Sequence, residues 1–288
     1  MEMTCNELKE KIKELHSEGR TNIEIMQEMK IDLRTLFSFL QRLKLKSNKH
    51  IQFKEDSDFK QFIYGSMLGD GTLTPIRGYS KTSRIRFSHG ASQYFYAEHK
   101  HNFIKKYGIG SKKVRVSVYK DNRFENRYYT HNTVESVVHP IFTKYREDFY
   151  PQNVKIIPQY VYENLDWRGV AWWFMDDGSV TGSSIELNTM NFTLQEIEKL
   201  RDMFIDKFNL HFNIITDKRV LNKNRGRKMY LQAKDFNKFV ENVKPLILPE
   251  FYYKFVTYEE RKRVQLKSDK LLENPEEDNQ QPIISLND

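Results

Sequence analysis

The sequence predicts an α+β protein: two pseudo-symmetric αββαββα halves whose antiparallel sheets form a saddle, preceded by a small all-α helix-turn-helix domain. Two observations predict the halves. A helical run that ends in Asp-Gly occurs at residues 63–71 and again at 170–178. Each run is followed by stretches that alternate apolar with basic or polar residues, and then by helical stretches. The leading domain is predicted by apolar residues at helical spacing over residues 4–46.

These patterns divide the chain into four parts. We expect a helix-turn-helix-like DNA-binding module, a first half, a second half and a disordered acidic tail, over residues 1–50, 58–160, 161–262 and 268–288.

Composition points to a nucleic-acid partner. The chain has 288 residues, a net charge of +8 and a pI near 9.2, which favours a polyanion. Cys5 is the one cysteine, so an internal disulfide and a cysteine-based zinc site are excluded, and a reducing compartment is expected. No apolar run reaches the ~18 residues that span a bilayer, and we expect neither a membrane partner nor a signal peptide.

The leading domain has the signals of three short helices. Leu8, Ile12 and Leu15 share one face of the first. Thr21 can cap the second helix and Asp32 the third. Tight turns between short helices predict a helix-turn-helix unit, with the third helix reading DNA. That helix would present Arg34, Thr35, Ser38 and Arg42. The alternative is a small bundle that docks on the main body.

The first half continues from the Asp-Gly run at residue 70. Alternation predicts a strand at 84–88, and a helix over 92–107 ends at Gly108. Further strands are predicted at 113–119 and 124–131, followed by a helix over 134–145.

The second half repeats this order. A strand is predicted at 184–188, and Thr193 can cap the next helix. Strands at 211–216 and 228–232 precede a helix over 235–243. In both halves another strand is expected directly after Asp-Gly.

The predicted sheets have one apolar and one basic face. Such faces would form a cationic groove in which a duplex lies, with strand side chains reading bases in the major groove. The alternative is an ordinary half-exposed sheet. The predicted DNA-contacting residues are Arg84, Arg86, Arg115, Ser117, Tyr119, Tyr128, Glu186, Asn188, Lys228 and Gln232.

Asp70 and Asp177 are the candidate acidic site. Small residues in the first run, Gly65, Ser66 and Gly69, would let two helices pack closely, which would bring both carboxylates together. Two nearby carboxylates repel unless a divalent cation lies between them, and Mg²⁺ binds few carboxylates together with waters and phosphate oxygens.

Two lysines hold matching positions after the last helix of each half. Lys155 follows Pro151, and Lys254 follows Pro249. A basic group beside a metal would steady the attacking water or the charge that develops on the phosphate.

The paired motifs resemble those of the LAGLIDADG homing endonucleases, in the monomeric form that carries two motifs per chain. Residues 63–71 look like a degenerate first copy and 170–178 like the second. The stretches 185–189 and 244–254 are also similar to that family. The resemblance covers about residues 58 to 260. Tyr64, Leu68 and Trp172 depart from the motif pattern.

The resemblance implies residue roles and an activity. Asp70 and Asp177 would bind Mg²⁺, with Gly69 and Asp176 beside them, and Lys155 and Lys254 would be the basic catalytic residues. The implied activity is Mg²⁺-dependent double-strand cleavage at a long, rare DNA site, which promotes intron or intein insertion. Double-stranded DNA would be the partner and the protein would act as a monomer.

Two other functions stay open. An RNA maturase on the same scaffold would assist splicing, and an inactive core would leave a DNA-binding regulator. The helical module suggests a bacterial or phage-encoded cytoplasmic protein, with an organelle as the alternative.

Overall fold

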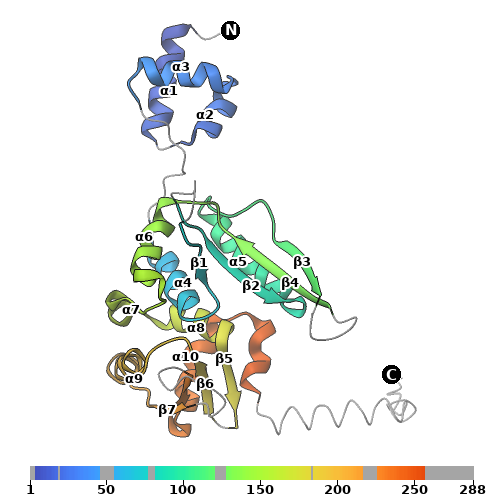
Figure 1. Ribbon diagram of the computed structural model, residues 1–288, viewed down its shortest axis with the longest axis vertical. Coiled ribbons are helices and arrows are strands. Elements are labelled where there is room, and N and C mark those ends of the chain that lie inside the picture. The colour runs from blue at the N-terminus through green and yellow to red at the C-terminus, as the bar shows by residue number, and fades with distance from the viewer. Residues whose placement is uncertain are drawn as a thin grey trace, which may run out of the picture. The chain divides into compact units, whose positions relative to one another are not determined.

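The computed structural model describes residues 4–18, 20–45, 55–76, 82–120, 128–182, 184–216 and 226–256 (Figure 1). The predicted tail over 268–288 lies outside these residues. The chain divides into two compact units, Met1–Lys60 with Asp70–Ile156, and Gln61–Gly69 with Ile157–Asp288. Among the described residues, no helix is long and apolar enough to cross a membrane.

The N-terminal module contains the three predicted helices, α1 (Cys5–Ser17), α2 (Asn22–Met29) and α3 (Leu33–Arg42). The predicted caps are present. Thr21 and Glu24 form a capping box, and the Asp32 carboxylate accepts a hydrogen bond from the Thr35 amide at 2.7 Å.

The first unit holds a four-stranded antiparallel sheet in the order β1-β2-β4-β3. Its strands are β1 (Thr72–Leu73), β2 (Ile85–Gly90), β3 (Arg115–Lys120) and β4 (Tyr128–Glu135). The helices around it are α4 (Ser57–Leu68), which continues into the second unit, α5 (Tyr94–Lys106) and α6 (Pro140–Phe149). Helix α5 covers one face of the sheet, on which Phe87 is fully buried (Figure 1).

One predicted helix in this unit was wrong at its start. Residues 134–135 belong to β4, and α6 begins at Pro140. Val134 pairs with Phe87 and is buried against the core, so the strand gains from extending this far. Pro140 suits the first helical turn, where its missing N–H costs nothing, and the His139 ring accepts a hydrogen bond from the Ile141 amide.

The second unit repeats the architecture. Its sheet has the order β5-β6-β8-β7 and is antiparallel throughout. The strands are β5 (Gly178–Thr181), β6 (Ser184–Asn188), β7 (Phe212–Thr216) and β8 (Arg227–Leu231). The helices are α7 (Gln159–Asn164), α8 (Trp167–Asp177), α9 (Leu194–Phe208) and α10 (Phe236–Val243). The order predicted for each half is therefore confirmed, and α7 is an addition.

Small residues allow residues 61–69 to pack closely on α8, as predicted. A Cβ placed on Gly65 would lie 2.1 Å from the carbonyl oxygen of Gly169, so no side chain fits there. Trp172, which departs from the motif, packs edge-to-face on Phe62 with ring centroids 4.9 Å apart. The motif thus tolerates a large side chain beside the glycine contact.

Candidate active site and nucleic-acid interface

Asp70 lies two residues beyond the end of α4, in the first unit, with 40% of its side chain exposed. The Nδ1 atom of His89 is 3.9 Å from its Oδ2. His89 comes from β2, has a buried side chain and packs on the ring of Tyr96, with centroids 4.8 Å apart. His89 was not among the residues predicted from the sequence, because a histidine at a core-facing strand position is typical of ordinary packing.

Asp177 is the last residue of α8, in the second unit, and is half-buried. The start of this helix is fixed by Asp166, whose carboxylate accepts hydrogen bonds from the amides of Arg168 and Gly169. Asp176 packs on Gly69, where an added Cβ would lie 2.5 Å from the Asp176 Cβ. Gly69 therefore leaves the space that the Asp176 side chain occupies.

The two predicted lysines both bond to backbone carbonyls at the end of a motif. Lys155 Nζ donates to the Gly71 oxygen at 3.1 Å, within the first unit. Lys254 lies in the 3₁₀ helix η5 (Pro249–Phe255) and donates to the oxygens of Phe174 and Met175 at 2.9 and 2.8 Å. The last carbonyls of a helix lack intrahelical partners and carry partial negative charge, so an ammonium group is stabilised there. In each unit a lysine is thus hydrogen-bonded to the motif that carries a candidate aspartate.

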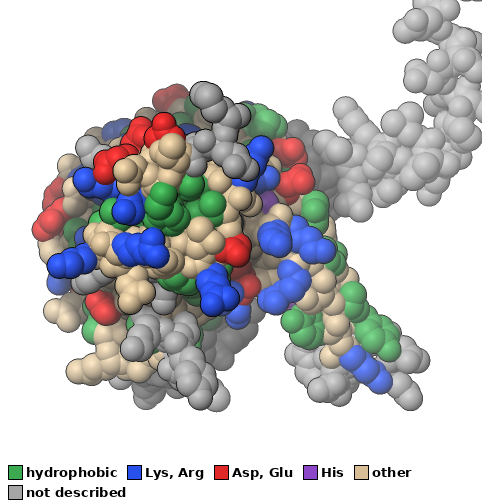
Figure 2. Space-filling view, turned by 90° about the horizontal axis from the view of Figure 1, so that it is seen from above, with side chains coloured by type: hydrophobic (Ala, Val, Ile, Leu, Met, Phe, Trp, Pro, Cys, Tyr) green, Lys and Arg blue, Asp and Glu red, His purple; other side chains and the backbone are tan. Residues whose placement is uncertain are grey.

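The first sheet presents a basic face on the side opposite α5. Arg86 and Ser88 on β2 alternate with the buried Phe87, and register places Arg115, Ser117 and Tyr119 on the same side. Figure 2 shows Lys and Arg side chains grouped in blue on the surface of the molecule, beside exposed hydrophobic side chains. The alternation of Arg86 and Ser88 with buried residues gives the first sheet the basic face that the sequence predicts.

Glu135 connects three arginines on this face. Its carboxylate lies 2.5 Å from Arg86 Nε, 3.5 Å from Arg84 Nη1 and 3.9 Å from Arg115 Nη2. Only 15% of the Glu135 side chain is exposed. The three guanidinium groups are thus held by one carboxylate.

Tyr128 lies on the other side of the first sheet. It pairs with Lys120, whereas Tyr129 pairs with Tyr119. Because side chains alternate along a strand, Tyr129 shares the basic face and Tyr128 faces the α5 side. The tyrosine that shares a face with Arg115 and Tyr119 is therefore Tyr129.

The second sheet carries the predicted residues on one half-buried face, opposite its core residues. Glu186, Asn188 and Lys228 alternate with core residues along β6 and β8, and Gln232 follows with the same parity. Lys228 Nζ is 2.6 Å from a Glu186 oxygen, and Gln232 donates to Asn213 at 3.4 Å. Tyr230 and Asn213 lie on the same face by register and were not predicted.

In the N-terminal module, Arg34 and Arg42 are exposed on α3. Thr35 and Ser38 are half-buried.

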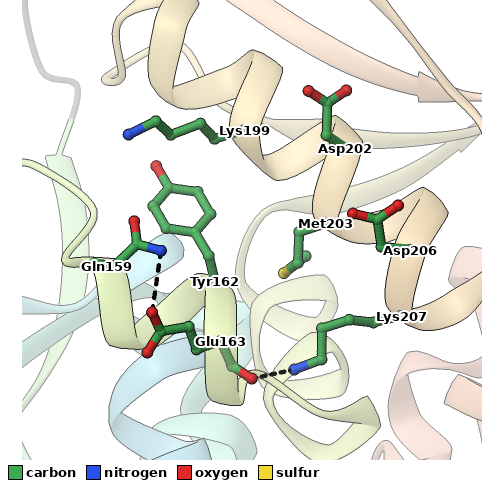
Figure 3. Close-up of a pocket in the computed structure, with 8 residues that line it drawn as sticks. All are labelled: Gln159, Tyr162, Glu163, Lys199, Asp202, Met203, Asp206 and Lys207. Carbon is green, nitrogen blue, oxygen red and sulfur yellow. Dashed lines mark hydrogen bonds between the residues drawn. The ribbon is translucent and has the colours of Figure 1, made fainter.

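A surface cleft of about 340 Å³ lies between α7 and α9 (Figure 3). Lys207 extends along it and donates to the carbonyl oxygen of Glu163 at 2.7 Å (Figure 3). It also donates to the carbonyl oxygen of Leu165 at 2.9 Å, so it caps the C-terminal end of α7. Burial lowers the pKa of Lys207. None of the predicted catalytic residues lines this cleft, so it is separate from the candidate site.

Comparisons with known proteins identify the family of this chain. The model of the "LAGLIDADG DNA endonuclease family" matches residues 60–239. The chain is 24% identical over 212 residues to the cytochrome b mRNA maturase bI2 of Debaryomyces hansenii, covering 70% of this chain and 75% of that relative. It is 29% identical over 132 residues to the intron-encoded endonuclease ai4 of Dictyostelium discoideum, covering 46% of this chain and 76% of that relative.

A solved structure among those that match shares the fold. It is the homing endonuclease I-WcaI bound to its DNA recognition sequence, with a TM-score of 0.63 and 23% identity over 77% of this chain and 92% of that chain.

These relatives correct one expectation. The prediction of a bacterial or phage-encoded cytoplasmic protein was wrong, because the relatives are intron-encoded or cytochrome b maturase proteins of yeasts and Dictyostelium. The helical module alone was too weak a sign of bacterial origin.

The family match extends over more than half of the chain and includes both Asp-Gly motifs, both sheets and the helices between them. This chain belongs to the LAGLIDADG DNA endonuclease family.

Proposed function

We propose that the chain is a site-specific endonuclease that cuts both strands of a long DNA target in the presence of Mg²⁺. The observation that carries the proposal is the repeated local arrangement. In each unit an aspartate ends the motif, and a lysine donates to carbonyl oxygens of that motif. Two equivalent catalytic sites, one in each unit, would require this arrangement twice. Because both motif copies lie in one chain, it would act as a monomer.

The donor groups at the two motifs fit Mg²⁺. Asp70 and Asp177 supply carboxylate oxygens at helix ends, where negative partial charge also favours a cation. When bound, a divalent cation would polarise the scissile phosphate and acidify a water molecule. Asp70 remains 40% exposed, which leaves room for waters and phosphate oxygens. Gly69 and Asp176 would shape the site beside these two residues.

The protein groups around these aspartates have separable roles. Lys155 and Lys254 would place positive charge near the phosphate that is cut. The two sheets would hold the duplex, with Arg84, Arg86 and Arg115 on the first sheet and Asn188, Lys228 and Gln232 on the second, together with Ser117, Tyr119 and Glu186.

A second candidate function is RNA maturase activity. It is favoured by the names of two relatives, the cytochrome b mRNA maturases bI2 of Debaryomyces hansenii and Saccharomyces cerevisiae. The chain is 24% identical to the latter over 205 residues and spans 47% of its length. A basic sheet face would suit an RNA backbone as well as DNA.

The test uses the full chain and a library of randomised DNA duplexes. Cutting is measured with Mg²⁺ and with Ca²⁺, for the native protein and for Asp70→Asn and Asp177→Asn. We expect cutting of both strands with Mg²⁺ and none in either variant, since asparagine keeps the shape but loses the charge. Tight binding without cutting would overturn the endonuclease proposal. Faster splicing of intron RNA in the presence of the same protein would then favour the maturase proposal.

A further inference from the structure

The N-terminal module, residues 4–45, is built around its own hydrophobic core. Ile12 and Leu15 of α1, Ile25 of α2, and Leu36 and Leu40 of α3 are buried together. The family match begins only at residue 60, so it assigns no role to this module. The three helices therefore pack on a core of their own.

The connection between α2 and α3 has the form of a DNA-binding turn. It consists of Lys30, Ile31 and Asp32. Lys30 lies in the left-handed region with φ of 52°, a conformation that reverses the chain after a helix. Asp32 then caps α3. A three-residue turn of this kind is typical of helix-turn-helix units, in which the second helix of the pair enters the major groove.

Helix α3 has an exposed face that the module does not use for its own packing. Its buried stripe is Leu36, Phe39 and Leu40. On the opposite side, Phe37 is 45% exposed and Leu33 is 48% exposed. Arg34 and Gln41 are exposed on the same side, at spacings of three and four residues from Phe37. The face thus offers a cation, an amide and apolar groups together.

Charge in the module is unevenly distributed. On α2 the exposed charged residue is Glu28, and Glu24 is half-buried in its capping box, whereas α3 and its two flanks carry the exposed basic residues Lys30, Arg34, Arg42 and Lys44 against Asp32 alone. Helix α1 mixes both signs. The basic side is therefore the α3 side, which fits a polyanion. Major-groove edges also present thymine methyl groups to apolar side chains and guanine acceptors to arginine.

We propose that α3 is a second sequence-reading element of this protein: it binds double-stranded DNA in the major groove, with Arg34 and Gln41 on base edges and Phe37 on a methyl group. Arg42, Lys30 and Lys44 contact phosphates. This rests on the proposed function only in its choice of DNA as the partner. The segment of DNA that α3 reads lies outside the one that the two sheets hold, so the module lengthens the target site.

The test is a nuclease-protection footprint of the full chain on duplexes that it selects from a randomised library. The variants are Phe37→Ala and Arg34→Gln. The matched controls are Ile23→Ala, an apolar side chain of α2 that is 65% exposed, and Lys13→Gln, an exposed lysine of α1. Thermal unfolding confirms that each variant is folded, which is expected because all four side chains point outward.

We expect Phe37→Ala and Arg34→Gln each to lose protection at one end of the footprint and to bind about tenfold more weakly, the scale of one base contact. The two controls should keep the full footprint. The readout of this test is binding and not cutting, so a failed cutting assay would overturn only the endonuclease proposal and would leave the footprint interpretable. A footprint that all four variants share would overturn the proposal. So would self-association that depends on Phe37 in sedimentation, since α3 would then bind a second copy, and so would failure to select any duplex.

Discussion

The Nζ atom of Lys254 donates a hydrogen bond to the carbonyl oxygen of Phe174, three residues before Asp177, and a second one to Met175. Only 9% of Lys254 is exposed, and its ammonium group also lies over the Phe174 and Phe251 rings, 5.4 and 5.0 Å from their centroids. The candidate catalytic lysine of the second unit therefore also holds the end of the motif helix in place.

Lys254→Met should lower stability as well as cutting, because two helix-end carbonyls would lose their buried donor. The expected loss is about 2 kcal/mol of unfolding free energy, the usual scale for losing a charged hydrogen-bond donor. The Phe174 oxygen keeps its bond from the Gly178 amide. Lys155→Met is the matched comparison, since Lys155 is half-buried and makes one such bond. It should reduce cutting with a smaller loss of stability. Urea unfolding checks both, and equal losses would contradict the dual role of Lys254.

Gly65→Ala should destabilise the second unit by overpacking. The new methyl group would lie 2.1 Å from the Gly169 oxygen and 2.7 Å from the Trp172 Cβ, so the helices must separate. Such strain costs about 1 to 3 kcal/mol or more. Gly90→Ala is the control, because a Cβ there meets nothing within 4 Å. The measurement is thermal unfolding, and the same midpoint for both variants would refute the close packing.

Glu135→Gln should make DNA binding less selective. Arg84, Arg86 and Arg115 would lose the carboxylate that orders them, and would be released to contact any phosphate. We expect tighter binding to random-sequence duplex and a lower ratio of specific to non-specific affinity. Glu147→Gln, which removes an exposed carboxylate from α6, controls for the change in net charge. Binding titrations at several salt concentrations measure the ratio, and the same shift in both variants would exclude a specific role for Glu135.

The sequence was sufficient for the order of elements, because the two Asp-Gly runs and the alternating strands are local patterns. It was insufficient wherever pairing across the sheet decides the outcome. Because a helix was predicted from residue 134, Glu135 was not assigned to a strand. The contacts of Glu135 with three arginines were therefore missed. Tyr128 and Tyr129 are neighbours in the chain, and only the register of β4 with β3 shows which of them shares a face with Arg115.

His89 and the wider α3 face were missed for a related reason. His89 alternates with Ile85 and Phe87 on the core side of β2, and its closeness to Asp70 depends on where the preceding helix α4 ends relative to this strand. Phe37 and Leu33 are apolar residues on an amphipathic helix, which favour burial until the packing of the three helices shows that they are exposed.

Asp235→Asn should lower stability near neutral pH and matter less in acid. The Asp235 carboxylate accepts a hydrogen bond from the His211 amide at 2.8 Å and lies 2.8 Å from the His211 ring nitrogen Nδ1, which ties the start of β7 to the start of α10. Burial raises the pKa of Asp235, but the hydrogen bonds from His211 outweigh it and hold the pKa below its usual 3.8. A depressed pKa means that the unfolded chain takes up the proton first as pH falls. The stabilisation is therefore complete above pH 3.8 and is lost as pH falls through the lower pKa of the folded state.

Asparagine at position 235 should cost about 1 to 2 kcal/mol of unfolding free energy near neutral pH. Urea unfolding of native protein and variant at neutral and acid pH measures this, with Asp202→Asn, whose side chain is 60% exposed, as the control. A difference that persists undiminished in acid would show that the charge of Asp235 contributes nothing, and that the side chain acts by packing alone.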